Sequence, residues 1–411
     1  MKAVVFTLGC KVNSCESASL LTGLKELGYE VSDSLGFADL YIINTCAVTQ
    51  EAEKKSRQTV ARVKRYNPNA KIIVTGCASQ KSPEDFLKKE GVTLVTGTAS
   101  KDRIISVLNE AGNIVWEESD YYEEFLPLSD GRSRAYIKVQ DGCNNFCSYC
   151  IIPYLRGRSR SRNPLKVVEE IEALNPVEAV ITGINLSAYN YQGKGLKELI
   201  EELSELNCRI RLGSLEVGVI TEEFLSALKG LKNFAPHFHL SLQSGADSVL
   251  KSMNRKYDRE TYYKKCCLIR RYFPDAAITT DVIVGYSTET ESDFLDSLEL
   301  CQRVEFADIH CFPYSRREGT VGAKLKELPS SVKDGRMDRI LAVKSKLKEN
   351  FVQKNLGKVL TVIPEEVVDG YTVGYTENYL RVYLKGEIKE KILRVEILSP
   401  YQDGALAKVY H

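Results

Sequence analysis

The 411-residue sequence lacks several features that would place it in a common class. No apolar run approaches the roughly 18 residues of a membrane-spanning helix, so we expect no membrane association. The formal net charge is only +1, so binding to nucleic acid would need local basic patches. The opening MKAVVFTLGC is too short and too soon interrupted to be a signal peptide, and we expect a cytoplasmic protein.

Familiar catalytic patterns are missing as well. We find no paired carboxylates, no nucleophile with an adjacent base, no phosphate-binding glycine loop and no internal repeat. Cysteine, in contrast, is plentiful, with twelve residues. In a reducing compartment such cysteines are better candidates for metal ligands than for disulfides. Six of them we interpret as buried, small hydrophobic residues: Cys15, Cys208, Cys266, Cys267, Cys301 and Cys311.

The first part of the chain alternates short apolar runs with helical patterns. Strands are expected at 3–9, 39–45, 71–76 and 92–97, with helices between them, and this order predicts a parallel sheet. The short helix at 82–90 should be capped by Ser82 and carry Pro83 in its first turn, and 100–112 should form another helix. We therefore expect an α/β domain over residues 1–116, followed by an acidic and polar linker over 117–134.

The alternation resumes in the central part of the chain. Six strands are expected there, at 135–140, 179–184, 209–215, 238–243, 278–285 and 306–315. Together with the intervening helices they predict a partial (βα)6 barrel over 135–350, ending in a helix at 331–350. Residues 351–411 contain short strands separated by turns, which predict a small antiparallel β-barrel. The overall fold class is thus an α/β multidomain protein.

Three cysteines each follow a predicted strand of the first domain. Cys10, Cys46 and Cys77 end the segments VVFTLGC, LYIINTC and IIVTGC. Parallel strands bring their C-terminal ends to one edge of a sheet, so these thiols should converge into a metal site. Gly9 and Gly76 would let the backbone turn tightly there. The alternative is three buried thiols that share this edge by chance.

A second group lies in the segment GCNNFCSYCIIPYLRGRSRSR, residues 142–162. Cys143, Cys147 and Cys150 have CxxxCxxC spacing directly after a predicted strand, and no fourth cysteine or histidine is nearby. A metal centre held by three thiolates keeps one position open for a small molecule with amine and carboxylate groups. The alternative is a zinc site with a distant fourth ligand, for which the candidates are His237, His239 and His310.

The CxxxCxxC motif, with Tyr149 before its last cysteine, resembles the radical S-adenosylmethionine (SAM) superfamily. The segments TLGCKVNSCES, INTCAVT, TGCASQ, YLRGRSRSR, LSLQSGADSVLKSMNRKY, TDVIVGYSTETESDF and HCFPYSRREGT resemble the methylthiotransferase family along the whole chain. GCKVN followed by ES resembles the subgroup acting on N6-threonylcarbamoyladenosine in tRNA. Two segments depart from the family pattern: YSTET at 286–290, where many members have FPGET, and SLEV at 214–217, where many have SLEP.

This resemblance implies two [4Fe–4S] clusters. Cys10, Cys46 and Cys77 would hold an auxiliary cluster, and Cys143, Cys147 and Cys150 the cluster that binds SAM. It also implies reductive cleavage of SAM to a 5′-deoxyadenosyl radical, with electrons from a donor such as flavodoxin or ferredoxin. A methylthio group would then be added to carbon 2 of the modified adenosine beside the anticodon, with a C-terminal TRAM domain contacting the tRNA.

Polar residues near the ends of the barrel strands are candidates for SAM binding, with barrel-filling polar residues as the alternative. Glu216 could accept hydrogen bonds from the ribose, and Thr182 and Gly183 could allow the methionine part close to the backbone. The remaining candidates are Ser241, Gln243 and Asp281.

Four arginines alternate with other residues after the second cysteine group. If the segment is extended, Arg156, Arg158, Arg160 and Arg162 face one way, about 6.6 Å apart, and form a ladder for RNA phosphates. The alternative is a solvated face with salt bridges. In the C-terminal barrel, the candidates for base stacking are Tyr371, Tyr375 and Tyr379, which equally suit core packing.

Other functions stay open from the sequence alone. The chemistry could be directed at another tRNA adenosine derivative or at a ribosomal protein side chain. The chain could also be a non-catalytic, metal-binding RNA-binding protein.

Overall fold

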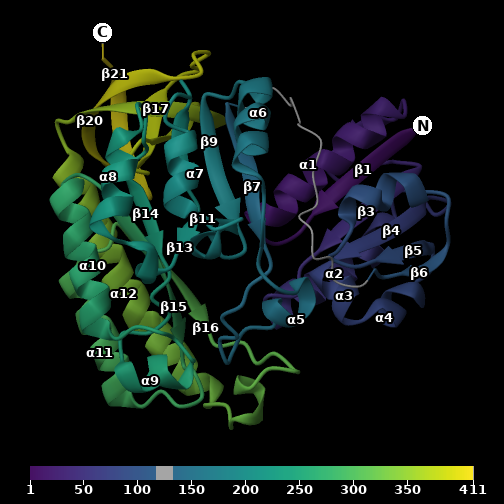
Figure 1. Ribbon diagram of the computed structural model, residues 1–411, viewed down its shortest axis with the longest axis horizontal. Helices are drawn as coiled ribbons and strands as arrows, with labels where there is room; N and C mark the ends of the chain where they lie inside the picture. The colour runs from purple at the N-terminus through teal and green to yellow at the C-terminus, as the bar shows by residue number, and fades with distance from the viewer. Residues whose placement is uncertain (117–132, 411) are drawn as a thin grey trace.

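The computed structural model describes residues 1–116 and 133–410 and contains three sheet systems (Figure 1). The predicted linker lies outside the described residues except for Ser133 and Arg134, and Arg134 already begins strand β7. None of the helices in the described residues combines the length and apolar character needed to cross a bilayer.

The N-terminal part is a six-stranded parallel sheet of order β2-β1-β3-β4-β5-β6. The four predicted strands are present, and the short edge strands β2 and β6 are additional. The strands are β1 (Lys2–Thr7), β2 (Glu30–Ser32), β3 (Leu40–Thr45), β4 (Lys71–Gly76), β5 (Val92–Thr96) and β6 (Gly112–Ile114).

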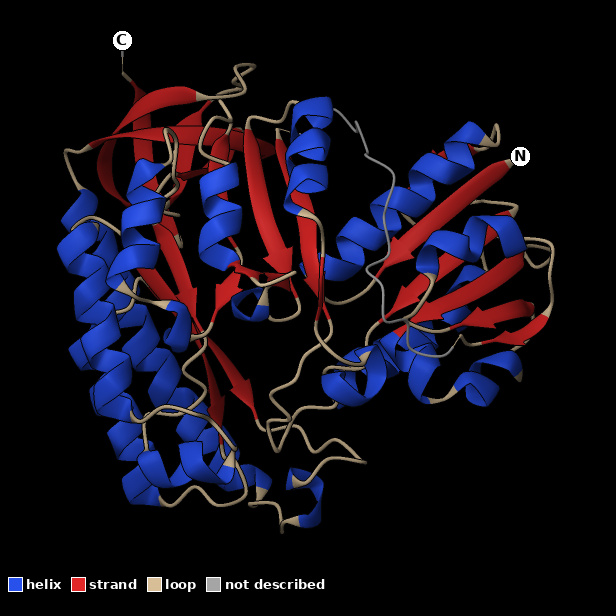
Figure 2. Ribbon diagram, in the orientation of Figure 1, coloured by secondary structure: helices blue, strands red, loops and turns tan. Residues whose placement is uncertain are grey.

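Helices cover both faces of this sheet (Figure 2). They are α1 (Lys11–Glu26), α2 (Gln50–Val63), α3 (Cys77–Lys81), α4 (Pro83–Leu87) and the 3-10 helix η1 (Lys101–Val107). Pro83 opens α4 as expected, but Ser82 makes no capping hydrogen bond through its side chain. The helix predicted at 100–112 is shorter and of 3-10 type, because the chain turns there into edge strand β6.

Six parallel strand segments form the partial barrel, as predicted. They are β7 (Arg134–Asp141), β9 (Glu178–Gly183), β12 (Arg209–Leu212) with β13 (Ser214–Leu215), β14 (His237–Leu240), β15 (Ala277–Val284) and β16 (Asp308–Pro313). The strand predicted at 209–215 is interrupted at Gly213. β12 pairs with β9, and β13 pairs with β14, so this segment joins two four-stranded sheets.

The outer layer of the barrel consists of helices whose apolar sides pack on the strands. Figure 1 shows α8, α10, α11 and α12 on the outer side, with α12 running beside β15 and β16. The longer helices are α6 (Pro164–Leu174), α7 (Leu196–Glu202), α8 (Glu222–Gly230), α10 (Arg259–Tyr272), α11 (Glu291–Val304) and α12 (Ser330–Asn355). The shorter ones are α5 (Ile152–Arg156), α9 (Asp247–Ser252), η2 (Leu186–Ala188), η3 (Val217–Val219) and η4 (Gly322–Lys324). Short strands β8 (Arg160–Ser161), β10 (Asn190–Tyr191) and β11 (Lys194–Gly195) complete this part.

The C-terminal strands close into a barrel of order β17-β18-β19-β21-β20. They are β17 (Val359–Val368), β18 (Tyr371–Thr376), β19 (Arg381–Lys385), β20 (Leu393–Tyr401) and β21 (Gly404–Val409). All pairs are antiparallel, as predicted, except β19 with β21, which is parallel.

A buried carboxylate joins this barrel to the central one. Glu178 is fully buried and pairs with Arg134, Arg209 and Arg211 at 2.6, 2.5 and 2.9 Å. The same arginines bind the C-terminal barrel: Arg209 and Arg211 donate to backbone carbonyls of β17 and of residues 376–377, and Arg134 pairs with Glu365. Three cations around one carboxylate therefore fix the two barrels together.

The tyrosines considered for base stacking pack within the protein. Tyr379 stacks on the His237 ring at 4.2 Å and on Tyr375 at 4.8 Å. Tyr371 packs against Tyr383 and Tyr401. These contacts favour the packing interpretation, with Tyr379 part of the junction between the barrels.

The expectation of six buried cysteines was only partly right. Cys266 and Cys301 are buried, and Cys15, Cys208 and Cys311 are partly buried. Cys267 is exposed, because neighbouring residues of helix α10 point about 100° apart and Cys266 takes the core side.

We predict that Glu178→Gln destabilises the protein strongly, because it leaves three buried arginines without their shared charge. Breaking a buried ion pair from one side costs about 3–5 kcal/mol in the free energy of unfolding, which urea titration measures. The matched control Glu205→Gln removes the carboxylate from an exposed pair with Lys232 and should cost less than about 0.5 kcal/mol. Equal effects of both changes would contradict the assignment.

The contribution of Glu178 to the stability of the protein depends on pH in a defined direction. Burial alone would raise the pKa of Glu178, but Arg211, Arg209 and Arg134 lower it to about 2 from the ordinary 4.5. A lowered folded-state pKa means that the stabilisation is complete above pH 4.5 and is lost as the pH falls toward 2. The stability difference between wild type and Glu178→Gln should therefore narrow below about pH 4.5.

Candidate active site

The first three cysteines converge as the sequence predicts. They follow β1, β3 and β4, which are neighbours in the sheet, at the C-terminal edge. Gly9 has φ +101°, and a Cβ there would lie 2.8 Å from the Cys46 sulfur; a Cβ on Gly76, with φ +104°, would lie 2.5 Å from a backbone oxygen. Only glycine fits these two turns, so both help to bring the thiols to one edge.

Amide and hydroxyl side chains hold these turns in place. Asn13 donates to the carbonyls of Leu8 and Thr45 at 2.7 and 3.1 Å, and Ser56 accepts from the Cys46 amide at 3.1 Å. The positions of Cys10 and Cys46 are thus fixed from the first turn of α1 and from α2.

The electrostatics of this edge suit a group that binds thiolates. Burial, with smaller contributions from the neighbouring Cys77 and Cys10, raises the pKa of Cys46 to about 11. Burial also raises the pKa of Cys77, while Arg156 opposes this by charge and by a hydrogen bond. Three soft donors that repel one another when ionised fit an iron–sulfur cluster, which places positive charge between them.

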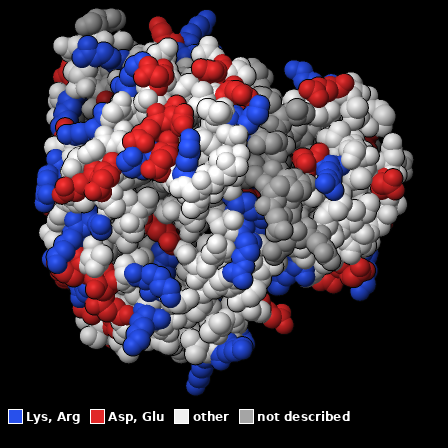
Figure 3. All heavy atoms as spheres, viewed as in Figure 1, with Lys and Arg blue, Asp and Glu red and all other residues white. Residues whose placement is uncertain are grey.

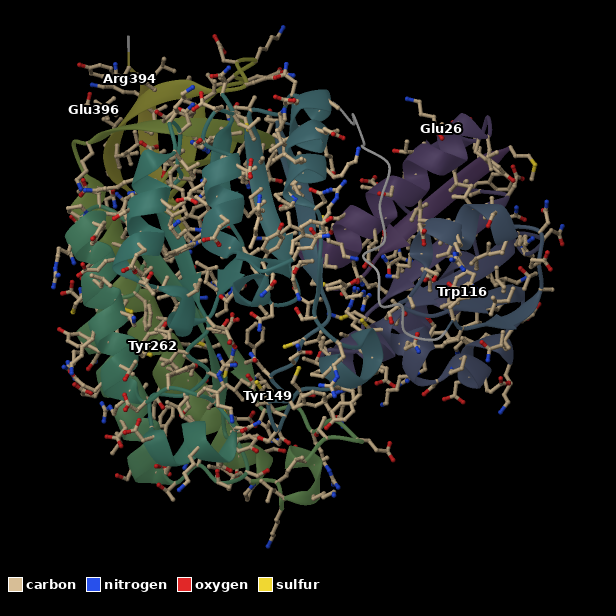
Figure 4. The ribbon with its side chains drawn as sticks, in the orientation of Figure 1. Glu26, Trp116, Tyr149, Tyr262, Arg394 and Glu396 are labelled. Carbon is tan, nitrogen blue, oxygen red and sulfur yellow. The ribbon has the colours of Figure 1, made fainter. Side chains whose placement is uncertain are left out.

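The second set of cysteines lies on a loop after β7, on the side of the barrel where the strands end. Gly142 has φ +70°, and a Cβ there would lie 2.0 Å from the Arg158 carbonyl oxygen. The loop is anchored by residues after α9: Met253 accepts from the Ser148 amide at 3.0 Å, and Asn254 donates to the Phe146 carbonyl at 3.1 Å. Figure 4 labels Tyr149 on this loop, between the barrel strands and α5.

Side chains also reach these thiols directly. Arg255 donates to the Cys147 sulfur at 3.3 Å, and Asn185 donates to the Cys143 sulfur at 3.7 Å. Burial raises the pKa of Cys150 to about 12, with Cys147 adding to the shift. Sequence reasoning assigned no role to Arg255 or Asn185, although Arg255 lies in the segment LSLQSGADSVLKSMNRKY.

Glu216 and Ser241, two of the candidates for SAM binding, lie beside this loop. Glu216 accepts from Asn145 at 2.7 Å and pairs with Arg255 at 3.0 Å. It lines a pocket of about 130 Å³ together with Cys147 and Tyr257. The Ser241 carbonyl accepts from Tyr257 at 2.7 Å.

Two further SAM candidates contact neighbouring residues of the barrel. A Cβ on Gly183 would lie 2.9 Å from the Gln140 side chain. The space beside the Gly183 backbone, next to Thr182, is therefore already occupied by a side chain of the protein. Gln243 has φ +68° and donates its amide to the Asp281 carbonyl at 2.8 Å.

The histidines form a group of their own. His239 contacts Asp281 at 3.1 Å and Thr279 at 3.0 Å, and His310 lies 3.6 Å from Asp281. His237 hydrogen-bonds Thr279 at 2.8 Å. Their imidazole contacts in the described part of the chain are thus with the barrel and C-terminal domain rather than with the thiols.

The expectation of a one-sided arginine ladder was wrong. The segment is extended only over β8, since Arg156 ends α5 and Gly157 turns the chain at φ +71°. Arg156, Arg160 and Arg162 are buried, and Arg162 pairs with Glu170. Arg158 alone of the four is exposed, over the Phe146 ring at 4.8 Å.

Arg156 instead ties the two cysteine-bearing edges together. Its guanidinium donates to Glu16 and Asn13 of α1 at 2.8 and 2.6 Å, and to Asp141 of β7 at 3.1 Å. Lys138 bridges the same two carboxylates, at 3.0 and 2.7 Å. Lys101 also pairs with Glu16, and Arg160 lies 3.6 Å from Asp141, so four cations surround two carboxylates.

A second link between the N-terminal sheet and the barrel is formed by Arg317 and Glu53. Arg317, from the segment after β16, pairs with Glu53 of α2, which also binds Arg57 and Lys81 at 2.7 and 3.2 Å. Both links connect the N-terminal sheet to the barrel near its strand ends.

Comparison with known proteins first defines the class. The Radical SAM superfamily model matches residues 137–301, and the model described as "Uncharacterized protein family UPF0004" matches residues 2–97. The fold is similar to that of the radical SAM methyltransferase TsrM from Kitasatospora setae, with a TM-score of 0.57 and 13% identity over 79% of this chain and 74% of that one. The chain is a radical SAM protein with a second cysteine-bearing domain.

Sequence similarity then gives the family. The chain is 37% identical to the threonylcarbamoyladenosine tRNA methylthiotransferase MtaB of Bacillus subtilis, over 100% of this chain and 97% of that protein. It is also 37% identical to the Aquifex aeolicus MtaB, over 88% and 92% of the two chains. A tRNA-2-methylthio-N(6)-dimethylallyladenosine synthase of Staphylococcus haemolyticus is 33% identical over 90% and 77%. This chain belongs to the methylthiotransferase family of radical SAM enzymes, in the MtaB subgroup.

We predict that Arg156→Met loosens the junction of the N-terminal sheet with the barrel. It leaves Glu16 and Asp141 buried with fewer cations, at a cost of about 3–5 kcal/mol. Amide hydrogen exchange in α1 and β7 should become at least about tenfold faster. The control Arg158→Met removes an exposed arginine of the same segment and should leave this exchange unchanged; unaltered exchange in Arg156→Met would rule out the link.

Proposed function

We propose that the protein adds a methylthio group to carbon 2 of N6-threonylcarbamoyladenosine next to the anticodon of tRNA. The observation that carries this proposal is the pair of three-cysteine sets at the C-terminal edges of two parallel sheets, connected through Arg156. The MtaB relatives, which align over the full chain, support the same reaction and substrate.

The cysteines account for the cofactors. Cys143, Cys147 and Cys150 suit a [4Fe–4S] cluster that binds SAM, and we assign a second, auxiliary cluster to Cys10, Cys46 and Cys77. When bound, these groups supply radical chemistry that acid–base side chains lack, since carbon 2 of adenine carries an unactivated hydrogen. A flavodoxin or ferredoxin is our candidate for the electron donor.

The protein's own residues position the reactants. Asn254 and the Met253 carbonyl shape the loop of the second cysteine set, and Arg255 places positive charge beside Cys147 and Glu216. Glu216 and Ser241 are SAM candidates that contact residues around this loop, through Asn145, Arg255 and Tyr257. We keep Thr182, Gly183, Gln243 and Asp281 as further candidates on or next to the barrel strands.

RNA contacts follow from what the surface offers. Figure 3 shows basic and acidic side chains intermixed over one face, with a short column of basic ones near the boundary of the two large lobes. Arg158, exposed beside Phe146 and the second cysteine loop, is the one member of the predicted ladder that we retain for phosphate contact.

We assign residues 1–116 to the cluster-bearing N-terminal domain, 135–350 to the radical SAM core and 351–411 to a TRAM-like domain that contacts the anticodon arm. Such a protein would act in the cytoplasm, where tRNA is found.

The test of the substrate is nucleoside mass spectrometry of tRNA from cells lacking this protein. The 2-methylthio form of threonylcarbamoyladenosine should disappear, and its threonylcarbamoyl precursor should accumulate. Loss of the methylthio form of dimethylallyladenosine instead would indicate that the substrate is the one named for the Staphylococcus haemolyticus relative. No change in any methylthio nucleoside would reject the proposal.

The two cysteine sets can be separated by substitution. Cys147→Ala should abolish SAM cleavage, whereas Cys46→Ala should still cleave SAM to deoxyadenosine without transferring sulfur. Iron after anaerobic reconstitution should fall from about eight to about four atoms per chain in each variant. Full product formation by Cys46→Ala would refute this division of roles, and stoichiometric zinc in the wild type would refute both clusters.

A further inference from the structure

Lys11 stands out because of where its side chain lies. It directly follows Cys10 and is the first residue of α1. Its ammonium nitrogen lies 5.9 Å from the centre of the Tyr136 ring, which belongs to β7 of the central barrel. The side chain keeps contact with solvent. A cation from the N-terminal domain thus faces a wall of the barrel, one residue from a thiol of the first cysteine set.

The other basic groups on this wall have ion-pair partners within the protein. Arg134, Arg209 and Arg211 share Glu178, and Lys138 pairs with Glu16 and Asp141. The Lys11 ammonium, in contrast, has no ion pair or hydrogen bond with any residue in 1–116 or 133–410, and its contact there is the Tyr136 ring. Arg134 and Arg211 repel the Lys11 ammonium, and this repulsion exceeds the attraction of Glu178.

An unpaired cation repelled by its neighbours is poised to bind an anion, and a Lys–carboxylate contact is among the stronger polar interactions in proteins. The substrate of the proposed reaction carries such a group. Its threonyl carboxylate is attached, through the carbamoyl group, to the N6 atom of the adenine whose carbon 2 reacts. Lys11 and Cys10 are adjacent in the chain, so one backbone segment carries both this cation and a thiol of the first cysteine set.

We propose that Lys11 binds the carboxylate of the threonylcarbamoyl group and so selects this nucleoside over uncharged N6-substituted adenosines. This inference rests on the proposed function and adds the residue that recognises the N6 substituent of the substrate. Lys11 acts here as a specificity-determining residue through its charge and position. An RNA phosphate is the other anion that could occupy the same site.

The test measures binding of three anticodon stem-loop RNAs to the holoenzyme by fluorescence anisotropy. They carry threonylcarbamoyladenosine, its uncharged methyl ester, or plain adenosine at the same position. Lys11→Gln keeps the length and a donor but loses the charge, and should weaken binding of the first RNA at least about tenfold, to the level of the ester RNA. The other two RNAs should bind Lys11→Gln and wild type equally well, and Lys11→Arg should retain most of the preference.

Lys25→Gln is the matched control, because Lys25 is an exposed lysine in the last turn of the same helix. It should alter none of the three affinities. An equal loss for all three RNAs in Lys11→Gln would show a phosphate contact and overturn the proposal, as would no loss for any of them.

The two proposals fail in different ways. If wild-type enzyme forms no methylthio product from the threonylcarbamoyl RNA, the proposed function is wrong. If wild type forms the product but Lys11→Gln binds the carboxylate and ester RNAs with the wild-type preference, only the inference about Lys11 is wrong. Iron content equal to that of the wild type confirms that the variant is folded and loaded.

Discussion

The guanidinium of Arg156 is completely buried and shared between Glu16 of the N-terminal domain and Asp141 of the barrel. Removing such a group from water costs free energy, and a buried charge therefore needs close ion-pair and hydrogen-bond partners. Here two carboxylates meet four cations, so two positive charges remain in excess close to Cys77. That excess favours anionic thiolates at the same edge, and the network therefore both joins the domains and prepares the charge of the site.

The arrangement depends on a general property of parallel sheets. The N-terminal sheet and the barrel both place their cysteines just after strand ends, where loops are free to carry function. Holding two such edges together requires contacts that fix the N-terminal sheet relative to the barrel. The ion pairs of Arg156 and Arg317 lie near those edges and provide such contacts. The Glu178 cluster performs a similar role at the opposite end, where it fixes the C-terminal barrel to the starts of β7, β9 and β12.

Much of the fold could be predicted from periodicity, because long apolar alternations dominate the strands and helices of all three parts. The errors have physical causes. The arginines after Cys150 look like a solvent-facing ladder in sequence, but Gly157 turns the chain and buried carboxylates from distant segments draw three of them inward. The sequence makes Tyr379 a candidate for base stacking, but in the structure His237, more than a hundred residues away in the chain, stacks on its ring. Local patterns contain no information about such partners.

The sequence by itself determined the two cysteine sets and the strand ends that carry them, because ligand spacing and strand–helix alternation are local and repeat clearly. It also determined the family, since the characteristic segments run through the whole chain. Only the tertiary structure decided which charged residues are buried in ion pairs and which keep contact with solvent. Arg156 and Lys11 are both basic and both close to a cysteine in sequence. Arg156 is buried between carboxylate and amide partners, whereas the Lys11 ammonium has no ion pair or hydrogen bond among the described residues. That difference arises from contacts between segments far apart in the chain.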